Sequence, residues 1–123
     1  MNKLKIFFAD DSDYSEINSM NGGSRNDVIV QIGDALYHPS FYDIFSVTQD
    51  FNRAIALNKV YEIDNALILV KETSKSEIIK AILSLYEAKY FDKVMPIDLK
   101  EEYKGSFDLF PALQSLSGWK QVY

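Results

Sequence analysis

The sequence contains no cysteine and only one histidine, His38. The absence of cysteine excludes a disulfide scaffold, a thiolate nucleophile and a Cys-ligated zinc ion, and a single histidine leaves a zinc site short of ligands. The longest uninterrupted apolar run, residues 66–70, is far below the roughly 18 residues that a membrane span needs. Lysine and arginine do not cluster as a phosphate backbone would require. We therefore expect a cytoplasmic protein that needs no metal or cofactor and contacts neither membranes nor nucleic acid directly.

The remaining composition is that of a globular protein. The chain has 123 residues, of which 47% are hydrophobic and 14% aromatic, and this length fits one domain spanning residues 1–123. The net charge of −5 is spread over both halves of the chain. An acidic surface favours cationic partners through electrostatic steering.

Hydrophobic patterns predict four strands. Residues 3–8 and 28–32 alternate between apolar and polar side chains, as half-buried strands do. We expect a third strand over residues 42–48, antiparallel to the second, and a central strand over residues 62–71 that is covered on both faces. The polar residues 10–26 are predicted to form a loop, and residues 33–41 a connection.

Helix signals are strongest in the second half of the chain. Ser74 and Glu77 have the spacing of a capping box, and apolar residues then recur every three or four positions, which predicts a helix ending near Phe91. Shorter helices are expected over residues 51–57, capped by Asp50 and stopped at Asn58, and over residues 110–116. The predicted fold class is α+β, with a mainly antiparallel sheet packed against two or three helices in a single pair of layers.

Acidic residues form the densest charged group near the N-terminus, at Asp10, Asp11, Asp13 and Glu16. The spacing does not fit a calcium loop, because Glu16 occupies the position that requires glycine. A solvated loop and a partner-facing patch remain as interpretations. Three later residues form a second candidate patch for a partner: Asp98, Glu101 and Glu102.

No arrangement in the sequence predicts catalysis. Ser40 and two aspartates lie near His38, but no nucleophile elbow of the Gly-x-Ser-x-Gly type accompanies them. Gly22-Gly23 lacks the lysine of a phosphate-binding loop and is interpreted as a pair of turn glycines. A group of four aromatic residues is expected to serve the core more than an interface: Tyr37, Phe41, Tyr42 and Phe45. We therefore predict that the protein is not an enzyme.

Two stretches give the sequence a family resemblance. Residues 28–47 resemble the opening hairpin of the bacterial immunity protein 8 family, and residues 65–70 with residues 113–123 resemble its later strand and its Trp-x-x-x-Tyr ending, here Trp119 to Tyr123. The resemblance implies a cytoplasmic antidote that binds a cognate toxin domain, for which a basic nuclease is one candidate. It implies no catalytic residue. The alternative, from another class, is a small self-associating structural or regulatory module.

Overall fold

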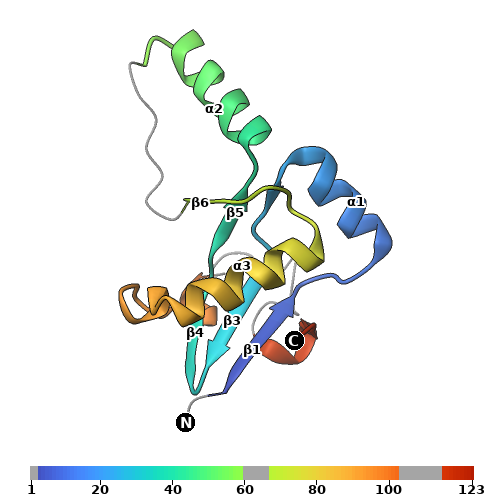
Figure 1. The fold of residues 1–123 in the computed structure, drawn as a ribbon, viewed down its shortest axis with the longest axis vertical. Coiled ribbons are helices and arrows are strands. Elements are labelled where there is room, and N and C mark those ends of the chain that lie inside the picture. The colour runs from blue at the N-terminus through green and yellow to red at the C-terminus, as the bar shows by residue number, and fades with distance from the viewer. Residues whose placement is uncertain (1–2, 60–66, 103–114) are drawn as a thin grey trace.

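The computed structural model describes residues 3–59, 67–102 and 115–123. Its strands are β1 (Leu4–Phe8), β2 (Ser24–Arg25), β3 (Val28–Ile32), β4 (Ala35–Tyr37), β5 (Ser40–Tyr42), β6 (Leu67–Leu69) and β7 (Lys120–Gln121). Its α-helices are α1 (Asp13–Gly22), α2 (Ile44–Ala56), α3 (Lys75–Glu87) and α4 (Leu99–Glu102), and two short 3-10 helices are η1 (Tyr90–Asp92) and η3 (Leu116–Gly118). The predicted α+β class is confirmed (Figure 1).

A four-stranded antiparallel sheet in the order β4-β3-β1-β7 forms the centre of the molecule. The first two predicted strands are confirmed as β1 and β3, which pair from Leu4 opposite Ile32 to Phe8 opposite Val28. The chain then reverses through Gly33, whose φ of 61° suits the first position of a two-residue hairpin turn. The predicted connection over residues 33–41 is wrong, because it contains β4 and most of β5.

Each face of this sheet packs on its own group of apolar residues. The alternation of β1 and β3 sends Ile6, Phe8 and Val30 towards α3, where Ile78 and Ile82 complete the larger core. α3 lies across this face in Figure 1. The predicted start of α3 at Ser74 is confirmed, because the Ser74 hydroxyl accepts a hydrogen bond from the backbone N–H of Glu77 at 3.4 Å, while the Glu77 carboxylate pairs with Lys80 Nζ at 3.3 Å.

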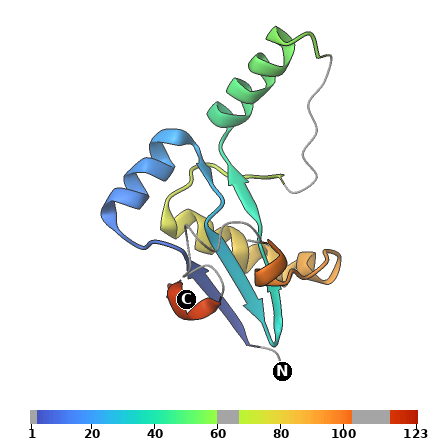
Figure 2. The same cartoon turned by 180° about the vertical axis from the view of Figure 1, so that it is seen from behind.

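The opposite face of the sheet carries a smaller core. Phe7 of β1 and Ile29 of β3 pack there with Leu99 of α4 and with Trp119. Figure 2 shows α4 and the C-terminal segment on this side. The predicted helix over residues 110–116 falls mostly outside the described residues, and its described end belongs to η3.

The predicted loop over residues 10–26 is wrong, because it contains α1 and β2. Ser12 caps α1 with its hydroxyl, which accepts from the Ser15 N–H at 3.1 Å. At the other end Gly23 adopts the left-handed conformation with φ 71° and its N–H donates to the Ser19 carbonyl oxygen. These are local helix signals, and the helix forms without a buried apolar face.

The predicted strand over residues 42–48 is also wrong, because α2 begins at Ile44. Asp43 caps this helix by accepting from the Ser46 N–H at 2.8 Å, so Asp50 lies inside the helix and does not cap it. Asn58 follows the end of α2 in the left-handed conformation at φ 66°, as expected for the residue that stops the helix.

The predicted central strand over residues 62–71 is described only from residue 67, as β6. β6 forms the edge of a second sheet in the order β2-β5-β6 and runs parallel to β5. Leu69 is exposed, so the expectation that this strand is covered on both faces is wrong at that position. α2 leaves this sheet and projects away from the body in both Figure 1 and Figure 2.

Candidate binding surface on the first helix

α1 carries the first acidic group of the sequence on a helix rather than on a loop. Asp10 precedes the helix and accepts from the Ser12 N–H at 2.9 Å. Asp13 and Glu16 lie in the first turn, where negative charge is favoured by the helix dipole. No basic residue occurs between Asp10 and Gly22. The helix is therefore locally stable for reasons of capping and charge, not of burial.

The contact between α1 and the body is polar. Glu16 Oε1 accepts hydrogen bonds from Arg25 Nη1 at 3.3 Å and from the backbone N–H of Lys75 at 2.7 Å. It thereby joins α1 to β2 and to the first turn of α3. No residue of α1 is buried, so apolar packing contributes little to holding the helix in place.

Two further polar contacts fix the orientation of α1. The fully buried Thr73 donates from Oγ1 to the Ser19 carbonyl oxygen at 2.8 Å. Lys75 Nζ forms an ion pair with Asp11 Oδ2 at 2.9 Å. Contacts near the start, middle and end of α1 thus determine which side of the helix faces solvent.

Arg25 is the buried centre of this network. Its side chain is 1% exposed and lies over the Phe8 ring, with the guanidinium carbon 4.3 Å from the ring centroid. It also donates to the Thr73 carbonyl oxygen at 3.2 Å and lies 3.5 Å from Asp27 Oδ1. A buried guanidinium requires partners of this kind, so the Glu16 carboxylate is held against the body of the protein, with its side chain 29% exposed.

The outward side of α1 carries three large apolar side chains at a spacing of three residues. Tyr14 is 75% exposed, Ile17 58% and Met20 42%. Asp13 lies one turn before Ile17 and is also exposed. We call these four residues, together with Asp10, the α1 outer face. It combines apolar area with uncompensated negative charge.

The structure divides the acidic residues that the sequence singled out. Asp10 and Asp13 are exposed, whereas Asp11 and Glu16 are paired with Lys75 and Arg25. Asp98 precedes α4 and Glu101 lies within it, both exposed. Glu102 is the last residue of α4. α4 and α1 lie apart in both Figure 1 and Figure 2, so the two predicted patches do not form one surface.

The aromatic group of the sequence divides in a similar way. Phe41 is fully buried and Tyr37 packs against the same core, with its ring centroid 5.1 Å from that of Phe91. Phe45 is exposed on α2. The expectation that this group serves the core is confirmed for Phe41 and Tyr37, and it is wrong for Phe45.

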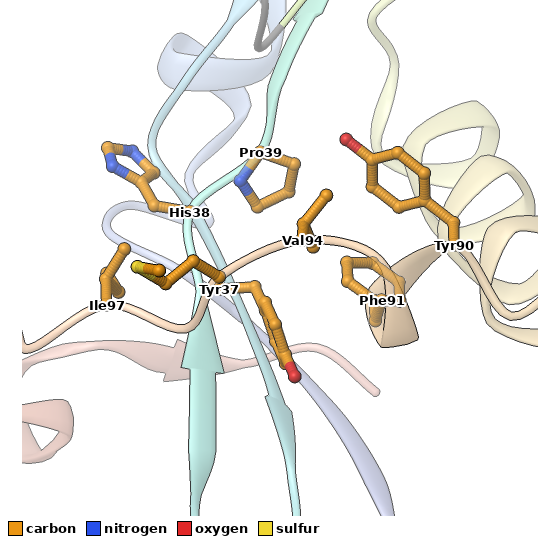
Figure 3. Close-up of a pocket in the computed structure, with 8 residues that line it drawn as sticks. Tyr37, His38, Pro39, Tyr90, Phe91, Val94 and Ile97 are labelled. Atoms are coloured by element: carbon orange, nitrogen blue, oxygen red, sulfur yellow. The ribbon is translucent and has the colours of Figure 1, made fainter.

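A shallow apolar pocket of about 230 Å³ lies between β4 and η1 (Figure 3). Its lining consists of Tyr37, His38, Pro39, Tyr90, Phe91, Val94, Met95 and Ile97. The His38 ring contacts the Asn26 carbonyl oxygen, and Asp43 of the same sequence neighbourhood caps α2. The volume is below the roughly 300–1,000 Å³ of ligand pockets, so we do not place a substrate here.

Neither a metal-ligand cluster nor a membrane-spanning helix is found in the described part of the chain. Over residues 3–59, 67–102 and 115–123, no three histidine or carboxylate side chains are grouped so that they could hold a metal ion. None of the helices described is both long and apolar enough to cross a membrane.

Comparison with known proteins finds no relative: no protein-family model, no curated protein and no solved structure matches the chain. The resemblance to the immunity protein 8 family therefore rests on the residues quoted for it above. The sequence does not predict the α1 outer face, because its polar residues 10–26 are expected to form a loop. The available signal was Ser12 as a helix cap, followed by apolar residues at a spacing of three.

Proposed function

We propose that this chain is a bacterial immunity protein that binds a cognate toxin domain in the cytoplasm and neutralises it by covering its active site. Two independent observations support the proposal. One is the resemblance of residues 28–47, 65–70 and 113–123 to an immunity family. The other is the α1 outer face, which has the composition of a binding surface for a cationic protein.

The α1 outer face is the observation on which the proposal depends most. Its inner side is fixed by Glu16, Ser19 and Asp11, so the apolar side chains of Tyr14, Ile17 and Met20 point to solvent in a fixed arrangement. Exposed apolar groups beside polar ones mark interaction sites, and tyrosine is enriched among residues that dominate binding energy. A preorganised surface of this kind loses little conformational entropy when a partner binds.

The mechanism of neutralisation requires no chemical step by this chain. Asp10 and Asp13 would attract a basic toxin domain and occupy the cationic contacts that its substrate uses, while Tyr14 would supply the buried anchor. Charges at the rim of an interface mainly raise the association rate, whereas the anchor mainly slows dissociation. The two groups of residues should therefore have separable kinetic effects.

The test is a kinetic comparison with the cognate toxin domain. We expect the double variant Asp10→Asn/Asp13→Asn to associate more slowly at low salt, and Tyr14→Ala to dissociate at least about tenfold faster. The matched control is Asp34→Asn/Asp92→Asn, which removes the same charge from exposed positions outside α1. If the control slows association as much as the α1 pair, only net charge matters and the α1 outer face is not the binding site.

A rival binding surface is the α4 side, with Asp98, Glu101 and Glu102. The same measurement separates the two surfaces, because neutralising Asp98 and Glu101 should leave both rates near those of the wild-type protein. A loss of binding there, with the α1 variants unaffected, would move the toxin interface to α4.

A further inference from the structure

The segment Asn21-Gly22-Gly23, at the end of α1, places a thermolabile amide beside a residue without a side chain. Asn21 and Gly22 are the last two residues of the helix, and both are exposed. A Cβ built on Gly22 meets nothing within 4 Å, so nothing beyond its chain neighbours and its own helix crowds this residue. The Gly22 nitrogen is therefore sterically open to react with the side chain that precedes it.

The reaction available to this pair needs only water. The backbone nitrogen of Gly22 forms a bond to Cγ of Asn21, the Cγ–Nδ2 bond breaks, and the amide leaves as ammonia with the proton of the Gly22 N–H. The product is a five-membered succinimide ring. Water then opens the ring at the side-chain carbonyl to give aspartate, or at the main-chain carbonyl to give isoaspartate. In total a water molecule is consumed and ammonia is released, with no oxidation or reduction.

The intact helix opposes this attack. In an α-helix each N–H donates along the axis to the carbonyl oxygen four residues earlier, so the Gly22 nitrogen is held away from Asn21 Cγ until the last turn opens. Opening loses little apolar contact, because no residue of α1 is buried. It does break hydrogen bonds at the Ser19 carbonyl oxygen, which accepts from the Gly23 N–H at 2.9 Å and from Thr73 Oγ1 at 2.8 Å.

We propose that Asn21 is a site of spontaneous deamidation and that opening of the last turn of α1 sets its rate. Thr73 belongs to the body of the protein and is fully buried, so its hydrogen bond to Ser19 holds the turn closed from outside the helix. Helix ends without buried side chains open locally at low cost in free energy. The rate of deamidation therefore follows the population of the open turn.

The products weaken the end of α1. Isoaspartate lengthens the main chain between Ser19 and Gly23, which disrupts the capping hydrogen bond between them. Both products add a negative charge in the last turn, where the helix dipole disfavours it, and no basic residue lies in that turn to compensate. An effect on toxin binding, through Met20 of the α1 outer face, rests on the proposed function; the deamidation itself does not.

Peptide mapping by mass spectrometry, on protein incubated under mildly alkaline conditions, tests the site. We expect deamidation at Asn21 to be several-fold faster than at Asn52, an exposed asparagine within α2 that is followed by Arg53. Labelling by an isoaspartyl methyltransferase should locate isoaspartate at residue 21. Equal rates at the two asparagines, or no reaction at Asn21, overturns the proposal.

Two variants test whether the helix controls the rate. Thr73→Val nearly keeps the side-chain shape but removes the hydroxyl, and it should speed deamidation of Asn21 about two- to tenfold, the range set by the net contribution of one hydrogen bond. Gly22→Ala stabilises the closed helix and crowds the attacking nitrogen, so it should slow the reaction at least about twofold. The control Thr48→Val removes a hydrogen-bonded hydroxyl from an exposed position of α2 and should leave the rate unchanged.

A folded Thr73→Val protein that deamidates at the wild-type rate would contradict control by the helix. Should this variant not fold, Glu16→Ala gives the same test, because it releases the middle of α1 from Arg25 and from the Lys75 N–H. Deamidation of Asn21 should be faster in this variant too, and an unchanged rate is again contrary. None of these measurements involves a toxin, so the deamidation site and the immunity function fail independently.

Discussion

Glu16 Oε1 accepts the backbone N–H of Lys75 at 2.7 Å across 59 residues of sequence. The same oxygen accepts from the buried Arg25 at 3.3 Å. One carboxylate thus satisfies an unpaired N–H at the start of α3 and a buried guanidinium, and it fixes α1 against both. Together with the contacts of Ser19 and Asp11, this residue fixes the orientation of the α1 outer face.

Replacing Glu16 by alanine should therefore lower the free energy of unfolding by about 2 kcal/mol, the scale of hydrogen bonds to charged groups. The loss is limited because Asp27 and the Thr73 carbonyl oxygen still contact Arg25. Urea denaturation followed by circular dichroism measures the change. Asp13→Ala, at an exposed position of the same turn, is the control and should change stability by less than about 0.5 kcal/mol. Equal effects of the two variants would show that Glu16 does not hold α1.

Alanine substitutions at the two adjacent glycines that end α1 should have opposite effects on the free energy of unfolding. Gly23 has φ +71°, and a Cβ there would lie 2.8 Å from Asp43 Cγ, whereas a Cβ on Gly22 meets nothing within 4 Å. Gly23→Ala should destabilise by about 1–2 kcal/mol from backbone conformation alone, and further if Asp43 is displaced from the α2 cap. Gly22→Ala should stabilise by about 0.5–1 kcal/mol, because alanine is the better helix residue.

Thermal unfolding of both variants tests this contrast. If Gly22→Ala lowers the thermal midpoint, or Gly23→Ala leaves it unchanged, then the end of α1 does not have this backbone conformation and this contact with Asp43.

Much of this architecture follows from local sequence patterns, and the exceptions have specific causes. β1, β3 and α3 were predicted because each has a regular row of apolar residues that packs in the larger core. The second half of α2 was predicted as the helix over residues 51–57. Its first half was missed because Tyr42 and Phe45 favour strands, although the spacing of the apolar residues 44, 47, 51 and 55 and the Asp43 cap were both present in the sequence. α1 was missed because polar residues dominate positions 10–26, while its three apolar residues face solvent and its contacts with the body are polar. The partners of Glu16, more than fifty residues away in the case of Lys75, are set by tertiary structure.

We expect Trp119 to stabilise the fold rather than to contact a partner. It is 5% exposed and closes the smaller core with Phe7, Ile29 and Leu99. Trp→Ala in a core costs roughly 3–5 kcal/mol, a large part of a typical stability of about 5–15 kcal/mol. We expect Trp119→Ala to lower the thermal midpoint sharply, as measured by circular dichroism. Unchanged stability with loss of toxin binding would make Trp119 an interface anchor instead.

Stability should not depend on a metal ion. The sequence has no cysteine and only one histidine, and a fold that required a transition metal would need more ligands than these. The thermal midpoint should be the same before and after exhaustive dialysis against EDTA. A fall of many degrees would reopen Asp10, Asp11 and Asp13 as metal ligands.

The proposed function is tested most directly by protection of cells that express the cognate toxin domain. Co-expression of the wild-type protein should restore growth, and purified protein should abolish toxin activity at a 1:1 ratio. Asp10→Asn/Asp13→Asn combined with Tyr14→Ala should protect less at equal expression, whereas Asp34→Asn/Asp92→Asn should protect fully. Continued growth arrest with the folded wild-type protein present would contradict the immunity function.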